Sequence, residues 1–128
     1  MHKFAKERIN AINGKLPFYQ LVVDGEKALD KFENKLEKSY GSELRTLITY
    51  MEYFATNYGS KSLPPKKFKY LDGKKQSDLV KEFEFKSKHL RIYGIIKDGA
   101  IIMLGGYKNS QPEDIIKFRS LKKSYLNI

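Results

Sequence analysis

The Asp98-Gly99 pair, set between two apolar segments, is the feature that most constrains the fold of this chain. Residues 90–97 (LRIYGIIK) and 100–108 (AIIMLGGYK) are rich in the branched and aromatic side chains that strands favour. Asp-Gly between two such segments is among the strongest signals for a tight hairpin turn. The sequence therefore predicts an antiparallel β-hairpin over residues 90–108.

A two-residue turn decides which side chains of this hairpin meet. With only Asp98 and Gly99 in the turn, Arg91 faces Gly106. Lys108 is then a diagonal neighbour of Arg91 at the open end of the hairpin, within reach of a long side chain. One face is expected to carry Arg91, Tyr93, Ile95, Lys97, Ala100, Ile102, Leu104, Gly106 and Lys108. The opposite face is expected in the core and carries Leu90, Ile92, Ile96, Ile101 and Met103.

Two cations this close favour an anion between them, because like charges repel without a counter-charge. Either a carboxylate such as Glu84 neutralises them in a structural salt bridge, or a bound anion does. For a phosphate, Arg91 offers a two-pronged grip and Lys108 a point charge. Gly106 has no side chain, so a ligand could approach the backbone there. Both interpretations remain open from the sequence.

The rest of the chain alternates between strand and helix patterns. Residues 80–87 (VKEFEFKS) alternate between phenylalanines and glutamates, as in a half-buried strand, and residues 16–24 (LPFYQLVVD) indicate another strand, ended by a turn at Asp24-Gly25. Helices are predicted over residues 3–13, 26–38 and 42–58, with Ser42 as the N-cap of the third. A last helix is predicted after Pro112. The helices over 26–38 and 42–58 are expected to form an antiparallel pair.

This order of elements predicts a single α+β domain over residues 1–128. Its main part runs strand, helix, helix, three strands and helix, with the helices packed on a small, mostly antiparallel sheet. The chain has 128 residues, of which 41% are hydrophobic, which suits one compact core.

The net positive charge of the chain comes almost entirely from its second half. Residues 1–60 hold nine Lys and Arg against eight Asp and Glu, whereas residues 61–128 hold 16 against seven, a balance of +9. Residues 61–78, which include Lys66, Lys67 and Lys69, are expected to form a long basic connection. Such a surface attracts polyanions. Nucleic acid, an acidic protein or an anionic membrane could each be the partner, and a solubilising lysine-rich surface is the alternative.

Several kinds of protein and site are not expected. The chain has no cysteine, which excludes disulfides, and only two histidines, His2 and His89, the second expected in an exposed loop. No apolar run approaches the roughly 20 residues of a membrane span, and the N-terminus lacks the apolar centre of a secretory signal. We therefore expect a cytoplasmic protein with no metal, no cofactor and no membrane association.

The second half of the sequence resembles the RelE/HigB superfamily of toxins from bacterial type II toxin–antitoxin systems. The run VKEFEFKSKHLRIYGIIKDGAIIMLGGYKNSQPEDI is similar to the strand–strand–hairpin–helix core of that family. Glu84 and Lys86 stand where members often carry a Glu-Leu-Arg triplet, and Arg91 begins a strand as in that family. The likeness covers roughly residues 66–126, and residues 1–15 look like an N-terminal extension.

The resemblance implies a RelE-like fold and a ribosome-dependent endoribonuclease that cuts mRNA. The reaction would be attack of a ribose 2′-hydroxyl on the adjacent phosphate, without a metal. Its partners would be mRNA on the ribosome and a cognate antitoxin that neutralises the toxin, which would exist as a monomer or as a toxin–antitoxin hetero-oligomer.

This reaction needs a base, an acid and a stabiliser of negative charge. Arg91 is expected to be the stabiliser, and Lys108 or Lys86 to share that role or to protonate the leaving oxygen. Glu84 is a candidate base, as is a lysine whose pKa is lowered. Tyr107 or Tyr93 could stack on a nucleobase or move a proton. The residues expected to contact the nucleic acid are Lys66, Lys67, Lys69, Lys81 and Tyr93. For the two tyrosines, ordinary sheet packing is the alternative.

Other functions remain open from the sequence. A ParE-like toxin would poison DNA gyrase by binding instead of cutting RNA. A non-catalytic nucleic-acid-binding module, or a degenerate toxin kept as an interaction module, would use the same basic face. The sequence does not indicate which codons or sequences would be cut, or which antitoxin would bind.

Overall fold

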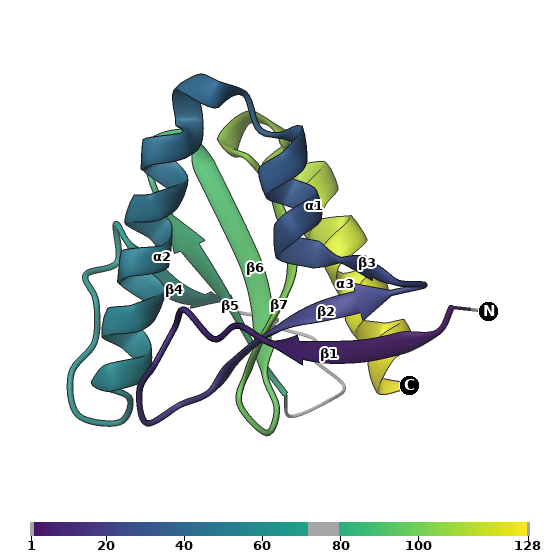
Figure 1. Cartoon of the computed structure of the whole chain (residues 1–128), viewed down its shortest axis with the longest axis horizontal. Coiled ribbons are helices and arrows are strands. Elements are labelled where there is room, and N and C mark those ends of the chain that lie inside the picture. The colour runs from purple at the N-terminus through teal and green to yellow at the C-terminus, as the bar shows by residue number, and fades with distance from the viewer. Residues whose placement is uncertain (1, 72–79, 128) are drawn as a thin grey trace.

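The structure, a computed structural model, describes residues 2–71 and 80–127. Within these ranges the chain forms seven strands, three α-helices and two short 3-10 helices (Figure 1). The strands are β1 (Phe4–Arg8), β2 (Phe18–Val23), β3 (Glu26–Lys27), β4 (Phe68–Leu71), β5 (Lys81–Lys86), β6 (Leu90–Ile96) and β7 (Ala100–Tyr107). The helices are α1 (Ala28–Lys35), η1 (Lys38–Tyr40), α2 (Gly41–Thr56), η2 (Lys108–Ser110) and α3 (Gln111–Leu126).

The seven strands form one mixed sheet. Six of them lie in the order β1-β2-β7-β6-β5-β4, and β3 pairs with β2 outside this path. Strands β2 and β7 run parallel, and every other neighbouring pair is antiparallel. The α+β class and the mostly antiparallel sheet that the sequence predicts are therefore confirmed.

Helices cover both faces of the sheet, which gives three layers (Figure 1). Helices α1 and α2 lie on one face, where the core includes Phe18, Phe32, Met51, Phe54, Phe83, Phe85, Ile92 and Ile102. Helix α3 lies on the other face, where the core includes Leu21, Tyr93, Ile95, Ile101, Met103 and Phe118. Because both faces are covered, the central strands are buried on both sides.

The β6–β7 hairpin forms as predicted, but with two irregularities. Ile96 pairs with Ala100, so the turn holds three residues instead of two, and Asp98 and Gly99 both adopt positive φ (52° and 109°). A bulge then places Met103 as an extra residue between the pairs Gly94–Ile102 and Tyr93–Leu104. The bulge offsets the longer turn, and Arg91 faces Gly106 as predicted.

Between the turn and the bulge, the predicted faces of β7 are exchanged. Ile101 and Met103 pack with Tyr93 and Ile95 against α3, and Ala100 and Ile102 pack on the α1/α2 side. The expectation that Ile101 and Met103 share a face with Leu90 and Ile92 was therefore wrong. A shift of one residue sends each side chain of a strand to the opposite face.

Strand β5 forms as predicted, but its glutamates are not exposed. Glu82 is 3% exposed and Glu84 is 0% exposed, because α3 lies over that face of the sheet. Nζ of Lys122 lies 3.1 Å from Oε2 of Glu82, and Nη2 of Arg119 lies 3.1 Å from Oε1 of the same residue. The alternating pattern therefore reflects a face covered by cationic helix side chains, and the prediction of a half-buried strand was wrong.

The N-terminal helix predicted over residues 3–13 is absent. Residues 4–8 form β1, which pairs with β2 from Phe4–Val23 to Arg8–Tyr19. Its alternating FAKER pattern presents Phe4 to Tyr125 of α3, with ring centroids 5.8 Å apart, and such contacts override a weak helical pattern.

The two helices predicted over 26–38 and 42–58 form, with corrections to their ends. The first begins two residues later, after β3. Ser42 is not the N-cap of α2, because that helix continues from η1 and Tyr40 occupies the cap position without a side-chain cap. The helices run in opposite directions but spread apart over the sheet (Figure 1).

The basic connection contains a strand. Phe68 to Leu71 form β4, which pairs with β5, and Phe68 is buried. The predicted connection spans residues 61–78, and its last part, residues 72–78, lies outside the described residues.

Candidate functional site

Arg91, the residue expected to hold a phosphate, is buried. It is 6% exposed and follows the same alternation as Tyr93, on the face that α3 covers. Its Nη1 atom donates hydrogen bonds to the carbonyl oxygens of Ser87 (2.6 Å) and Leu90 (2.8 Å). The guanidinium therefore holds the β5–β6 connection in place, and the expected open hollow between Arg91 and Lys108 is absent.

The predicted catalytic residues are divided by the sheet. Glu84 lies fully buried on the α3 side, where its Oε2 accepts a hydrogen bond from Gln111 Nε2 at 2.9 Å. Tyr107 packs on the opposite side against Tyr40, with ring centroids 5.4 Å apart, and its hydroxyl accepts a hydrogen bond from the Glu37 backbone at 3.3 Å. Lys108 is exposed in η2 and Lys86 is half-buried at the end of β5.

A buried polar cluster surrounds Tyr93 beneath the first turn of α3. Four atoms in the part of the chain that the structure describes are buried without a hydrogen-bond partner: Glu84 Oε1, Arg91 Nε, the Tyr93 hydroxyl and Asp114 Oδ2. Burial raises the pKa of Tyr93 well above its usual range, and the charges of Glu84 and Asp114 add to that rise. Burial also raises the pKa of Asp114. Glu84 and Tyr93 are fully buried, so they are not placed to touch a substrate.

The lysines expected to bind nucleic acid gather at the β4 edge of the sheet. Lys66 and Lys69 are exposed, and Lys67 places its Nζ 5.0 Å from the ring centroid of Tyr50. Nζ of Lys81 lies 5.0 Å from the ring centroid of Tyr70, which is 39% exposed. Lys66 and Lys67 therefore lie at the start of β4 near Lys86, whereas Lys81 lies at the opposite end of β5. Nζ of Lys69 lies 3.7 Å from Oε1 of the buried Glu84. Tyr93 is the exception, because its ring is fully buried against Phe118.

Three basic segments converge at the end of the sheet where β5 meets β6. The backbone N–H of Lys86 donates to the carbonyl of Lys67 at 2.8 Å. The backbone N–H of Lys108 donates to the carbonyl of His89 at 2.8 Å. The turn that contains Lys86 and Lys88 therefore lies between the lysines before β4 and the lysine after β7.

At this end of the sheet, His89 and Glu43 form a pair that sequence reasoning missed. Nδ1 of His89 lies 2.9 Å from Oε1 of Glu43. Oε2 of Glu43 accepts hydrogen bonds from the Ser87 hydroxyl (2.6 Å) and the His89 backbone N–H (2.9 Å). The His89 side chain is 45% exposed, and its ring packs on Tyr40 at 5.2 Å between centroids.

Burial raises the pKa of Glu43, but its hydrogen bonds from Ser87 and His89 outweigh this and lower the pKa below its usual value. Glu43 lies in the first turn of α2, where the helix dipole also favours a carboxylate. The two residues are 46 positions apart, so no local motif joins them. Two features of the sequence could have suggested the pair: an acidic residue in the first turn of a strongly patterned helix, and a histidine between two predicted strands.

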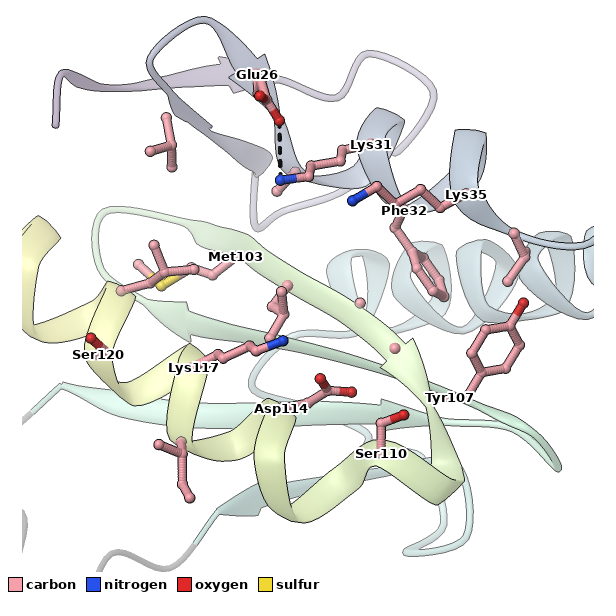
Figure 2. A pocket seen from close by; sticks show the side chains of 18 of the residues that line it. Glu26, Lys31, Phe32, Lys35, Met103, Tyr107, Ser110, Asp114, Lys117 and Ser120 are labelled. Atoms are coloured by element: carbon pink, nitrogen blue, oxygen red, sulfur yellow. Dashed lines mark ion pairs between the residues drawn. The ribbon is translucent and has the colours of Figure 1, made fainter.

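A groove of about 820 Å³ lies between α1 and α3, with β7 beneath it (Figure 2). Its apolar lining includes Phe32, Leu36, Met103, Leu104, Ile116 and Leu121. Lys31, Lys35 and Lys117 also line it, and Lys31 lies 3.1 Å from Glu26. Ile116 is 71% exposed, the most exposed large apolar side chain in the described part of the chain. Asp24, Glu26 and Asp114 line it as well, so the groove combines an apolar lining with charges of both signs.

Across residues 2–71 and 80–127, no helix is long and apolar enough to cross a membrane. The same ranges contain no group of three or more His, Asp or Glu placed to hold a metal ion. Comparison with protein-family models, with curated proteins and with solved structures found no match.

Proposed function

We propose that this protein is a RelE/HigB-like toxin of a type II toxin–antitoxin system that cuts mRNA on the ribosome. The observation that carries the proposal is the convergence of Lys67, Lys86 and Lys108 on one end of the sheet through two backbone hydrogen bonds. Lysines carried by three segments whose backbones meet at one end of the sheet suit the phosphates of a single nucleic-acid strand. The likeness of residues 66–126 to that family supplies the reaction, and such a toxin acts in the cytoplasm.

The burial of Arg91 changes which residues would stabilise negative charge. In the proposed reaction Lys86 and Lys108 take this role, because their side chains reach solvent at the end of the sheet. Arg91 acts indirectly, by fixing the turn that carries Lys86 and Lys88. The lysines of the β4 edge hold the strand farther from the reacting phosphate.

The proposal is tested with purified ribosomes, a defined mRNA and the protein made by cell-free synthesis. Cleavage within the mRNA, mapped by primer extension, supports the proposal, and the Lys108→Ala variant is expected to cut more slowly. The Lys3→Ala variant is the matched control, because Lys3 is an exposed lysine beside β1, at the opposite edge of the sheet from β4. An intact mRNA at every protein concentration would contradict the proposal.

A non-catalytic nucleic-acid-binding module is the second candidate. The sealed positions of Glu84, Arg91 and Tyr93 favour it, because three of the expected functional groups do not reach solvent. Binding of RNA without cleavage would identify this function. Inhibition of gyrase supercoiling without RNA cleavage would instead indicate a ParE-like toxin.

The groove between α1 and α3 is the surface proposed for the antitoxin. Its apolar lining requires an amphipathic segment, and Lys35 and Lys117 require acidic residues on that segment. The segment of the antitoxin that we propose to bind there is acidic and amphipathic. The Ile116→Glu variant should keep its toxicity but escape neutralisation when both proteins are coexpressed. The control is Tyr53→Glu, at another exposed apolar position, which should remain neutralised.

A further inference from the structure

We infer that His89 and Glu43 form the proton-transfer pair of the proposed RNA cleavage, with His89 as general base and Glu43 as the residue that orients it. This inference rests on the proposed function and assigns the base, which the sequence analysis sought in Glu84 or a lysine. Both of those candidates fail on position or chemistry: Glu84 is 0% exposed, and a lysine must lose its proton before it can accept one.

The geometry of Glu43 fixes the imidazole ring. One carboxylate oxygen accepts from the backbone N–H of His89 and from Ser87, so the carboxylate is anchored to the turn itself. The other oxygen lies 2.9 Å from Nδ1. A carboxylate is an acceptor, so Nδ1 carries the proton in this contact. In the neutral ring Nε2 is then the free acceptor, which is the atom that a general base needs.

The ring is held but remains accessible. Tyr40 packs on one side of His89, while the side chain remains 45% exposed. Glu43 of α2 and Tyr40 of η1 contact the ring, and Ser87 of its own turn bonds to the same carboxylate. The backbone of Lys108 bonds to the His89 carbonyl, and Lys88 is its neighbour in the chain, so one carboxylate and two lysine-bearing segments adjoin the imidazole.

The reaction that follows conserves atoms and charge. Nε2 of His89 takes the proton of a ribose 2′-hydroxyl, and the 2′ oxygen forms a bond to the adjacent phosphorus. The bond from phosphorus to the 5′ oxygen breaks, and that oxygen receives a proton from Lys108 or from water. The products are a 2′,3′-cyclic phosphate and a 5′-hydroxyl end. Glu43 stabilises the imidazolium that forms in this step.

The substrate class is therefore RNA with a free 2′-hydroxyl at the cut site. A matched mRNA carrying a single 2′-deoxy nucleotide at the mapped position should not be cut there. Cleavage of that substituted strand at the wild-type rate would overturn the assignment of His89 as base toward the 2′-hydroxyl.

The test compares His89→Ala and Glu43→Gln with His2→Ala, the only other histidine, in the ribosome assay and in RNA binding. We expect His89→Ala to lower the cleavage rate by about 10²–10⁴-fold with unchanged RNA affinity. His2→Ala should cut at the wild-type rate. In Glu43→Gln, kcat should fall with little change in KM for the RNA, because a neutral amide no longer stabilises the imidazolium that forms during the reaction.

The outcomes separate this inference from the proposed function. If the wild type cuts mRNA and His89→Ala cuts equally fast, the inference is overturned and the toxin proposal stands. If the variants unfold, or lose RNA affinity to the same extent as the cleavage rate, the pair is structural and the inference is overturned. If the wild type does not cut RNA at all, both fail.

Discussion

Gly106 and Asp114 lie so close together that a Cβ atom on residue 106 would overlap the Oδ2 atom of Asp114. Gly106 belongs to β7 and Asp114 to the first turn of α3, so this contact sets how near the helix approaches the sheet.

The Gly106→Ala variant should lose about 1–3 kcal/mol of stability, because the added methyl overpacks this contact. The cost should shrink in the Gly106→Ala/Asp114→Ala double variant, where the overlapping atom is gone. Urea unfolding of the four proteins in the cycle measures the coupling. Gly41→Ala is the control and should be neutral or stabilising, because the nearest atom to its Cβ is 3.8 Å away in a helix. If the stability changes of the two single variants simply add up in the double variant, the two residues are not coupled, which would contradict the contact.

Asp114 should make the protein less stable as pH rises. Burial raises the pKa of Asp114 in the folded state above the ordinary value of 3.8, so the folded state binds more protons between those two values. Stability therefore falls as pH increases through that window and stays lower above it. Asp114→Asn should be more stable than the wild type at pH 7, and this advantage should disappear below pH 3.8. Chemical denaturation of the wild type and of Asp114→Asn across this pH range measures both effects. A stability difference between the two proteins that does not change with pH would contradict a raised pKa of Asp114.

Glu82 and Lys122 form a buried ion pair whose disruption should be costly. Their charged atoms are 3.1 Å apart and both side chains are nearly inaccessible. Glu82→Leu leaves the Lys122 ammonium buried without its carboxylate and should cost about 3–5 kcal/mol. The Glu82→Leu/Lys122→Met double variant should be more stable than Glu82→Leu alone. Glu113→Gln, an exposed position on the same helix, should change stability by less than about 0.5 kcal/mol. Thermal and urea unfolding measure all of these.

Tyr93→Phe should leave the protein at least as stable as the wild type. The Tyr93 hydroxyl is buried without a hydrogen-bond partner, so its removal relieves an unsatisfied group that costs about 1–3 kcal/mol. Tyr107→Phe is the contrast, because its hydroxyl accepts a hydrogen bond from Glu37, and it should lose about 0.5–1 kcal/mol. The RNA cleavage rate of Tyr93→Phe should match the wild type. A slower cleavage rate in Tyr93→Phe would show that the Tyr93 hydroxyl takes part in the reaction.

The β4 edge should contribute measurably to the salt dependence of RNA binding. Each contact with a single-stranded phosphate contributes about 0.7 to the slope of log K against log salt concentration. The Lys66→Gln/Lys81→Gln variant should therefore reduce the slope by about 1.4. Lys3→Gln/Arg8→Gln, at the opposite edge of the sheet, should leave it unchanged. Fluorescence anisotropy with a labelled 12-nucleotide RNA gives the slopes, and equal slopes for the two variants would contradict an RNA path along β4.

The sequence predicted the strands of the sheet better than it predicted which faces of the sheet the helices cover. The hairpin, strand β5 and the helix over residues 42–58 follow from local patterns, because turn chemistry and side-chain periodicity act over a few residues. That Arg91, Tyr93 and Ile95 share one face of β6 was also predicted, although residues 100–103 of β7 were assigned to the wrong faces. That this face is covered was not, because the pattern KEFEF looks the same whether water or cationic side chains of α3 meet the glutamates.

Only the part of the site that depends on local sequence was predicted. Lys66, Lys67 and Lys69 come from one stretch of sequence and lie at or beside the start of β4 in the fold. The pairing of His89 with Glu43 depends on how α2 lies over β5 and β6, which no local spacing encodes. Arg91 was misjudged because its donors find carbonyl groups on its own turn, an arrangement that the register alone does not show.

The bulge at Met103 and the three-residue turn at Lys97 to Gly99 have a consequence for how this hairpin can vary in length. One adds a residue to β7 and the other displaces the pairing by one, so together they leave Arg91 opposite Gly106. A relative that loses a residue in the turn must also lose the extra residue of β7 to keep the same partners. Insertions and deletions at these two places should therefore be inherited jointly.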